Sequence, residues 1–160
     1  NGDVVVAGNV RGAFEGTNSD GDMLVARYDG GGNEKFATLI RKVGTETATS
    51  VVAAADGSIY VGGQASSEDG GDAYVVKVDS AGHIAARQSY DTGTSEKITS
   101  LAMGADGKLL ALTREGENSS LRFLDTSDLS SETGRVDLGT RGADDADCRQ
   151  RRLGAHLLRP

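Results

Sequence analysis

The sequence predicts an all-β fold built from repeats of about 50 residues. The pair Asp56-Gly57 stands between two short apolar runs, which is the strongest local signal for a β-hairpin. The same pair returns fifty residues later as Asp106-Gly107. No window of the chain shows a convincing helical period of apolar residues. A repeat of this length, made of short strands, indicates the fold class.

Each period contains about four short strands, which is the content of one blade of a β-propeller. The chain therefore predicts β-propeller-type repeats with about three four-stranded blades, in a partial or open propeller. The repeat copies cover about residues 1–45, 46–95 and 96–139. The predicted strands are Asp3–Asn9, Asp22–Tyr28 and Glu34–Ile40 in the first copy, Thr49–Ala55, Ser58–Gln64, Asp72–Val78 and His83–Tyr90 in the second, and Thr99–Gly104, Lys108–Arg114, Ser119–Leu124 and Gly134–Leu138 in the third.

The first copy begins inside the repeat, because Asp3–Asn9 corresponds to a second strand and has no first strand before it. The Gly-rich polar stretch Val10–Asp20 is expected to be a loop to the third strand. A closed propeller needs roughly four to eight blades. We therefore expect either a piece of a longer propeller or a homodimer that completes a ring, since open sheet faces and unpaired edges favour association.

The third strand of each copy is apolar on both faces, as expected for a strand covered by a sheet on either side. In the second strand of the middle copy, Ile59 and Val61 are expected in the core. Arg27, Lys77 and Arg122 are expected to hold equivalent positions in the three copies. We expect each of them to pair with a nearby carboxylate rather than to form a functional ring of cations.

These residues carry a family resemblance. The run Ser50–Gly63, followed by Gly71–Gly82, resembles the bacterial SBBP-type β-propeller repeat, whose pattern has a D-x-x-G-N-[IV]-Y-V-x-G turn and strand and a D-A-[FY]-V-x-K-[LV]-D-x-x-G strand. The third copy departs from it, with Leu112-Thr113 in place of the Gly-Gly pair. The resemblance implies a propeller in a bacterial protein, often secreted, surface-associated or tied to flagellin production. The family shares no catalytic residues.

Composition limits the partners. The formal net charge of −7 argues against nucleic acid and against an anionic membrane surface, because both attract basic patches. No apolar run is long enough to span a bilayer, and no signal peptide is visible. The one cysteine, Cys148, forms no disulfide within the chain. The resemblance favours a secreted or cell-surface location.

The last segment, residues 140–160, breaks the repeat. It contains the one cysteine, the one proline and a run of arginines in an otherwise acidic chain. We expect a disordered or non-native basic tail that is dispensable for folding.

The chemistry-bearing residues are sparse. The acidic residues Asp20, Asp22 and Asp72 are candidate calcium ligands near equivalent loops, although the spacing of an EF-hand fails here. His83 is expected to be an exposed turn residue, and no G-x-S-x-G motif is present. No cofactor other than calcium is indicated.

Three functions are open at this point. The favoured one is a non-enzymatic scaffold or protein-interaction module. An enzyme of the lyase or hydrolase type is less favoured, since it would require His83 and carboxylates to converge in a propeller channel. The third is a calcium-stabilised surface protein using Asp20, Asp22 or Asp72.

Overall fold

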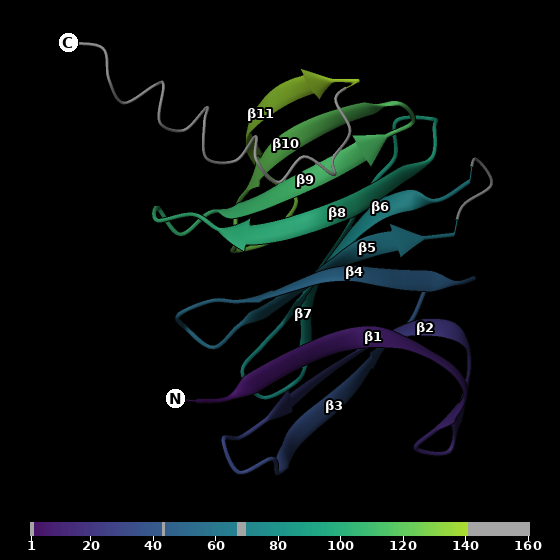
Figure 1. Cartoon of the computed structure of the whole chain (residues 1–160), viewed down its shortest axis with the longest axis vertical. Coiled ribbons are helices and arrows are strands. Elements are labelled where there is room, and N and C mark those ends of the chain that lie inside the picture. The colour runs from purple at the N-terminus through teal and green to yellow at the C-terminus, as the bar shows by residue number, and fades with distance from the viewer. Residues whose placement is uncertain (1, 43, 67–69, 141–160) are drawn as a thin grey trace.

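The computed structural model describes residues 2–42, 44–66 and 70–140, and within them the chain is all-β, with eleven strands and no helix. The strands form three antiparallel sheets (Figure 1). No described segment could therefore cross a bilayer as a helix. The predicted tail falls on residues 141–160, which lie outside the described part.

In the first sheet the strands are β1 (Val4–Phe14), β2 (Thr17–Tyr28) and β3 (Glu34–Ile40). In the second sheet they are β4 (Glu46–Ala53), β5 (Ile59–Ala65), β6 (Asp72–Val78) and β7 (Ile84–Tyr90). In the third sheet they are β8 (Glu96–Met103), β9 (Leu109–Glu115), β10 (Asn118–Leu124) and β11 (Glu132–Gly139).

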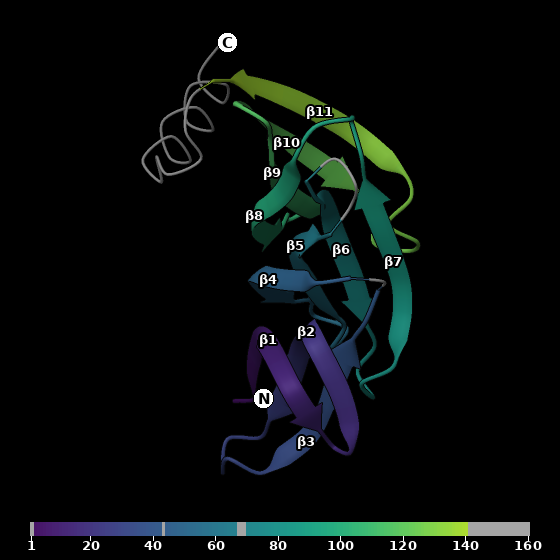
Figure 2. The same cartoon turned by 90° about the vertical axis from the view of Figure 1, so that its right-hand side faces the viewer.

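The sheets stack face to face, with the second between the other two (Figures 1 and 2). Strand β4 contacts both β1 and β8, whereas β3, β7 and β11 form the opposite edges of their sheets. Strand β6 places alternate residues in two separate cores, which confirms that both of its faces are buried. The first core, which includes Ile59 and Val61 as predicted, is Met23, Val25, Ile40, Ile59, Val61, Ala65, Tyr74, Val76 and Val78. The second is Tyr60, Ala73, Val75, Ile98, Leu101, Leu109, Ala111, Leu124 and Leu129.

The two Asp-Gly pairs lie in the turns of β-hairpins, as predicted. At Asp56-Gly57 the Gly57 N–H donates to the carbonyl of Ala54 at 3.0 Å, and φ of Gly57 is +86°. The Asp56 carboxylate accepts the N–H of Ser58 at 2.9 Å, and this bond holds the pKa of Asp56 below its usual value. The same pattern recurs at Asp106-Gly107. A short side chain that accepts its own turn amide fixes each hairpin locally.

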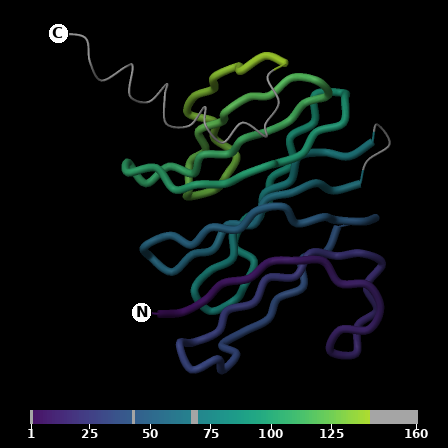
Figure 3. The backbone as a smooth tube through the Cα atoms, viewed as in Figure 1, coloured from purple at the N-terminus to yellow at the C-terminus, as the bar shows by residue number. Residues whose placement is uncertain are grey.

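The expectation of a loop at Val10–Asp20 is wrong. Strands β1 and β2 continue through it as a paired hairpin, in which Arg11 lies opposite Asp20 and Phe14 opposite Thr17. The hairpin closes at Glu15-Gly16, where both residues have positive φ, 45° and 78°. That is the backbone twist of a two-residue hairpin turn. Figure 3 shows the backbone folding back at this tip. The polar composition had suggested a loop, but exposed residues on a solvated hairpin have no need to be apolar.

Arg27 and Lys77 are equivalent, because they pair across the sheet with Val5 and Tyr60, but the expectation that Arg122 shares their position is wrong. Arg122 lies opposite Ala111, the equivalent of Val61, and therefore holds the place of Val76. Arg27 pairs with Asp3 at 2.8 Å, and Arg122 pairs with Glu115 and Glu132. The ammonium of Lys77 instead donates to the carbonyl of Thr126 at 2.7 Å. All three cations thus bond to neighbouring groups within the chain, although they do not form one repeated position.

Glycine at position 63 allows a close approach of two backbones. Strand β4 has an irregular register between Ala48 and Ser50, and a Cβ added to Gly63 would lie 1.8 Å from the carbonyl oxygen of Thr47. No side chain fits at that distance without a backbone shift. Gly8 occupies the corresponding place in the first sheet, where a Cβ would meet nothing within 4 Å.

We expect Gly63→Ala to lower the free energy of unfolding by more than about 3 kcal/mol, because the paired strands must separate. Gly8→Ala, the matched control, should change it by less than about 1 kcal/mol. Urea unfolding followed by far-ultraviolet circular dichroism measures both. A Gly63→Ala protein within about 1 kcal/mol of the parent would contradict the close approach.

Candidate functional site

The candidate site lies at the contacts between sheets, where buried carboxylates meet. Glu46 begins β4 and Glu96 begins β8, fifty residues apart, and both side chains are fully buried. Each lies near an aspartate of the preceding sheet: Asp22 in β2 for Glu46, and Asp72 at the start of β6 for Glu96. Two acidic pairs are thus built by the repeat itself.

A repeated amide contact positions these glutamates. The side-chain amide of Asn9, in β1, donates to the backbone carbonyl of Glu46. In the next sheet the amide of Gln64, in β5, donates to the backbone carbonyl of Glu96 at 2.8 Å. The Glu96 N–H in turn donates to the carbonyl of Gly71 at 2.8 Å. These bonds fix the first residue of β4 and of β8 against the neighbouring sheet, so the carboxylates have little freedom to leave.

At the contact between the first and second sheets, the charge is partly balanced. Arg41, which directly follows β3, holds the carboxylate of Asp22 at 3.1 Å. Both carboxylate oxygens of Glu46 are buried without a well-aligned hydrogen-bond partner among the described residues, although the Lys42 backbone N–H and the Asp22 side chain lie near enough to act on the pKa of Glu46. Burial, with a smaller contribution from the negative charge of Asp22, raises the pKa of Glu46 to about 7. Glu46 can therefore be protonated near neutral pH.

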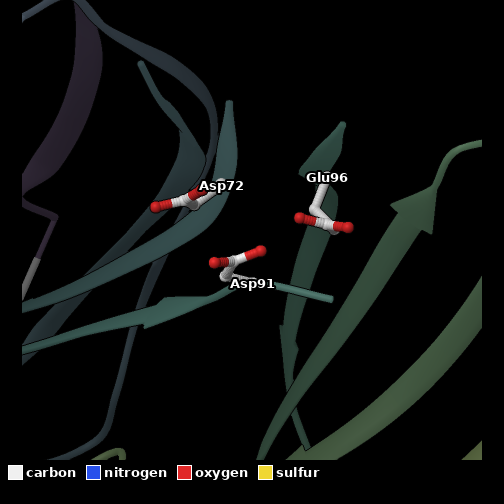
Figure 4. Close-up of side chains that lie close together, drawn as sticks. All are labelled: Asp72, Asp91 and Glu96. Atoms are coloured by element: carbon white, nitrogen blue, oxygen red, sulfur yellow. The ribbon is translucent and has the colours of Figure 1, made fainter. Parts of the chain in front are cut away.

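At the contact between the second and third sheets, three carboxylates converge. One carboxylate oxygen from each of Asp72, Asp91 and Glu96 lies within 4.8 Å of the other two (Figure 4). The first and last are buried, and Asp91 is exposed. Among the described residues, the ammonium of Lys42 lies 3.2 Å from the Asp72 carboxylate.

The two oxygens of Glu96 differ. Oxygen Oε1 accepts the N–H of Thr94 at 3.1 Å and the hydroxyls of Thr94 and Thr92. Oxygen Oε2 is buried and has no hydrogen-bond partner among the described residues. An unpartnered buried carboxylate oxygen costs free energy unless a cation or donor reaches it.

The two sheet contacts carry side chains of opposite charge at one equivalent position. Arg41 follows β3 and Asp91 follows β7, and the two residues are fifty apart. The first contact therefore has a guanidinium where the second has a third carboxylate. Of the two contacts, only the second has the donor set of a site for a divalent cation, since hard cations prefer several carboxylate oxygens.

The structure separates the three aspartates predicted from sequence. Asp20 is exposed on β2, Asp22 is paired with Arg41, and Asp72 joins the three-carboxylate cluster. Sequence reasoning missed Asp91 and Glu96 as partners of Asp72. The fifty-residue offset could have identified Glu96, which repeats Glu46, but the approach of Asp91 depends on the packing of two sheets.

Other candidate features do not assemble a reactive group. His83 lies 80% exposed in the turn between β6 and β7, as predicted, with its ring 3.3 Å from Asp79. The cluster at Asp72 lies at the opposite end of β6. Two open hollows flank the turn after β4, with volumes of about 360 and 460 Å³. The charged residues that line them include Asp56 and the ion pair of Asp3 with Arg27.

Neither a protein-family model nor a curated protein sequence matches the chain. The resemblance to the SBBP-type repeat therefore remains a hypothesis based on the residues quoted for it.

Burial of Glu46 predicts that stability falls as the pH rises. Below about pH 4.5 the carboxyl is protonated in both states, and between pH 4.5 and about 7 only the folded state keeps its proton. The free energy of unfolding should therefore fall by up to about 3 kcal/mol as the pH rises through this window, and Glu46→Gln should remove most of that loss. Urea unfolding at pH 5 and pH 8 measures it.

The matched control is Glu34→Gln, because Glu34 is exposed on β3. It should leave the pH dependence unchanged. The aspartates whose pKa is lowered by turn amides act in the opposite sense and below about pH 4, outside this window. An equal loss of stability in the parent and in Glu46→Gln would contradict a raised pKa for Glu46.

Proposed function

We propose that the chain forms three blades of a β-propeller and serves as a non-enzymatic interaction module whose first partner is a second copy of itself. The observation that carries the proposal is the apolar outer face of each end sheet. Net charge of −7 disfavours nucleic acid as the partner. A bacterial, secreted or flagellum-associated setting rests on the SBBP resemblance alone.

The outer face of the first sheet is apolar. Val4 and Val6 of β1 are 55% and 46% exposed. Their equivalents in β5, by the repeat, are Ile59 and Val61, which are 1% and 0% exposed in the first core. The register pairs Val6 with Ala26, which lies on the same face but is only 2% exposed, so the exposed apolar surface consists of Val4 and Val6. The first sheet covers Ile59 and Val61 of the second sheet, but no described residue covers the equivalent Val4 and Val6 of the first sheet.

The third sheet has a comparable outer face. Leu109 and Ala111 of β9 point into the second core, so the alternation of a strand places Leu110 and Leu112 on the other face. The equivalents of these two residues in β5 are Tyr60 and Gly62. Tyr60 lies in the second core, and a Cβ on Gly62 would meet Ile98 of β8 at 2.7 Å. The outer face continues through cross-strand pairs with Leu121, Phe123 and Val136.

The two outer faces are complementary by construction. By the repeat, each sheet has one face equivalent to the outer face of β9 and one face equivalent to the outer face of β1. At each contact between sheets within the chain, a face of the first kind packs on a face of the second kind. A second copy presenting its first sheet to this third sheet would repeat the internal contact. Such a contact is head-to-tail, and it closes a ring when two copies meet at both ends.

The enzyme alternative has less support. It requires His83 and carboxylates to converge, and His83 lies in an exposed turn. The ion pairs at the hollows hold Asp3 and Arg27 against each other. The observations on the end faces favour association over catalysis.

We expect the purified chain to associate in a concentration-dependent manner, measured by light scattering coupled to size-exclusion chromatography. Val6→Glu on the first sheet and Leu112→Glu on the third should each give monomers, because a buried charge opposes the contact. An equimolar mixture of the two variants should give heterodimers, since each retains the face that the other lacks.

The control is Ala85→Glu on β7, where Ala85 is exposed at the edge of the second sheet. It should associate like the parent. A parent chain that stays monomeric at all concentrations would contradict the proposed self-association, as would a mixture of the two variants that remains monomeric.

A further inference from the structure

We propose that Asp72, Asp91 and Glu96 form a calcium site that links the second and third sheets. The three residues come from β6, from the connection after β7 and from the start of β8. This inference does not depend on self-association, because the cluster lies at a contact within the chain.

The spacing of the oxygens fits one large divalent cation. Ca²⁺ binds oxygen at about 2.3–2.6 Å, so two ligands on opposite sides of the ion lie at most about 5 Å apart. One oxygen from each of the three carboxylates lies at most 4.8 Å from the other two. Mg²⁺, with bonds of about 2.0–2.1 Å, would limit that separation to about 4 Å and demands stricter octahedral geometry. Ca²⁺ also accepts flexible coordination by several carboxylates, whereas Mg²⁺ keeps most of its waters, so a cluster of three carboxylates suits calcium better.

The local charge also favours a cation. Three carboxylates face one ammonium, that of Lys42, which contacts Asp72 and also lies 3.1 Å from the Ser89 hydroxyl. Glu96 is 0% exposed, and its oxygen Oε2 is buried without a hydrogen-bond partner among the described residues. In Figure 4, Glu96 and Asp91 point toward each other across the sheet contact. A bound cation would give that oxygen its missing partner.

The first sheet contact shows how the fold otherwise supplies the charge. There Arg41 follows β3 and pairs with Asp22 at 3.1 Å. Asp91 stands at the equivalent position after β7, so the second contact has lost the guanidinium and gained a ligand. The calcium ion would take the place of Arg41, and it would hold β6 and β8 together through Asp72 and Glu96.

The test uses the full chain, stripped of metal and titrated with CaCl2 by isothermal titration calorimetry, with thermal unfolding in CaCl2 and in EDTA. We expect binding with a dissociation constant of about 1 mM or tighter, the range of weak protein calcium sites, and a rise in the unfolding temperature. MgCl2 at the same ionic strength should bind at least tenfold more weakly.

Three variants locate the site. Asp91→Asn, at an exposed position, should weaken calcium binding at least tenfold, whereas Asp20→Asn, the matched control on β2, should bind like the parent. Asp91→Arg, which copies the first sheet contact, should bind no calcium and should unfold in EDTA at a higher temperature than the parent. Lys42→Gln should tighten calcium binding, because it removes the competing ammonium.

Two results would overturn the proposal. The first is a parent chain with no heat of calcium binding and the same unfolding temperature in 10 mM CaCl2 (about tenfold above the expected dissociation constant) as in EDTA. The second is unchanged calcium affinity in Asp91→Asn. Neither result bears on the light-scattering experiment, so failure here and failure of self-association are distinguishable.

Discussion

The face-to-face contact between neighbouring sheets is the constraint on which the rest of the structure depends. A sheet of three or four strands is stable only when its apolar face is covered. Strand β6 shows the consequence, since Tyr74 and Val76 enter one core while Ala73 and Val75 enter the other. A middle sheet must be apolar on both faces, and the same pattern in the end sheets leaves an outer apolar face. That requirement connects the repeat to the proposed association.

Polar groups at the sheet contacts decide how the sheets are oriented. The hydroxyl of Thr49, at the irregular register of β4, lies within hydrogen-bond distance of the Gly62 carbonyl in its own sheet and the Ile98 carbonyl in the next. The hydroxyl of Ser50 accepts the Leu101 N–H at 2.9 Å. Apolar burial is non-directional, whereas these bonds have defined geometry. They fix the place of β8 on β4, and so bring Glu96 to the start of β6.

Much of the fold was predictable because its signals are local. The Asp-Gly turns and the apolar third strands depend on neighbouring residues, and the bounds of β3 and β6 agree with the prediction. The hairpin through Val10–Asp20 was missed, because a solvated strand has no apolar pattern and Glu15 adopts a positive φ that its type rarely takes. Only one of the three aspartates expected to bind calcium, Asp72, lies in the cluster, because the register between sheets selected Asp91 and Glu96.

A repeat protein makes such a site by changing few residues. The scaffold of each sheet contact is common to both: an amide from the second strand, a buried glutamate and an aspartate of the preceding sheet. The charge of the residue after the fourth strand then decides whether the buried carboxylates are neutralised within the chain. With Arg41 the contact is partly neutralised by the protein itself, and burial raises the pKa of Glu46 to about 7, so that protonation can reduce the remaining cost. With Asp91 the same geometry concentrates negative charge, and a divalent cation is the partner that we propose for the three carboxylates. In this proposal, one change of charge at an equivalent position turns a structural contact into a cation-binding site, without any change in the fold that positions it.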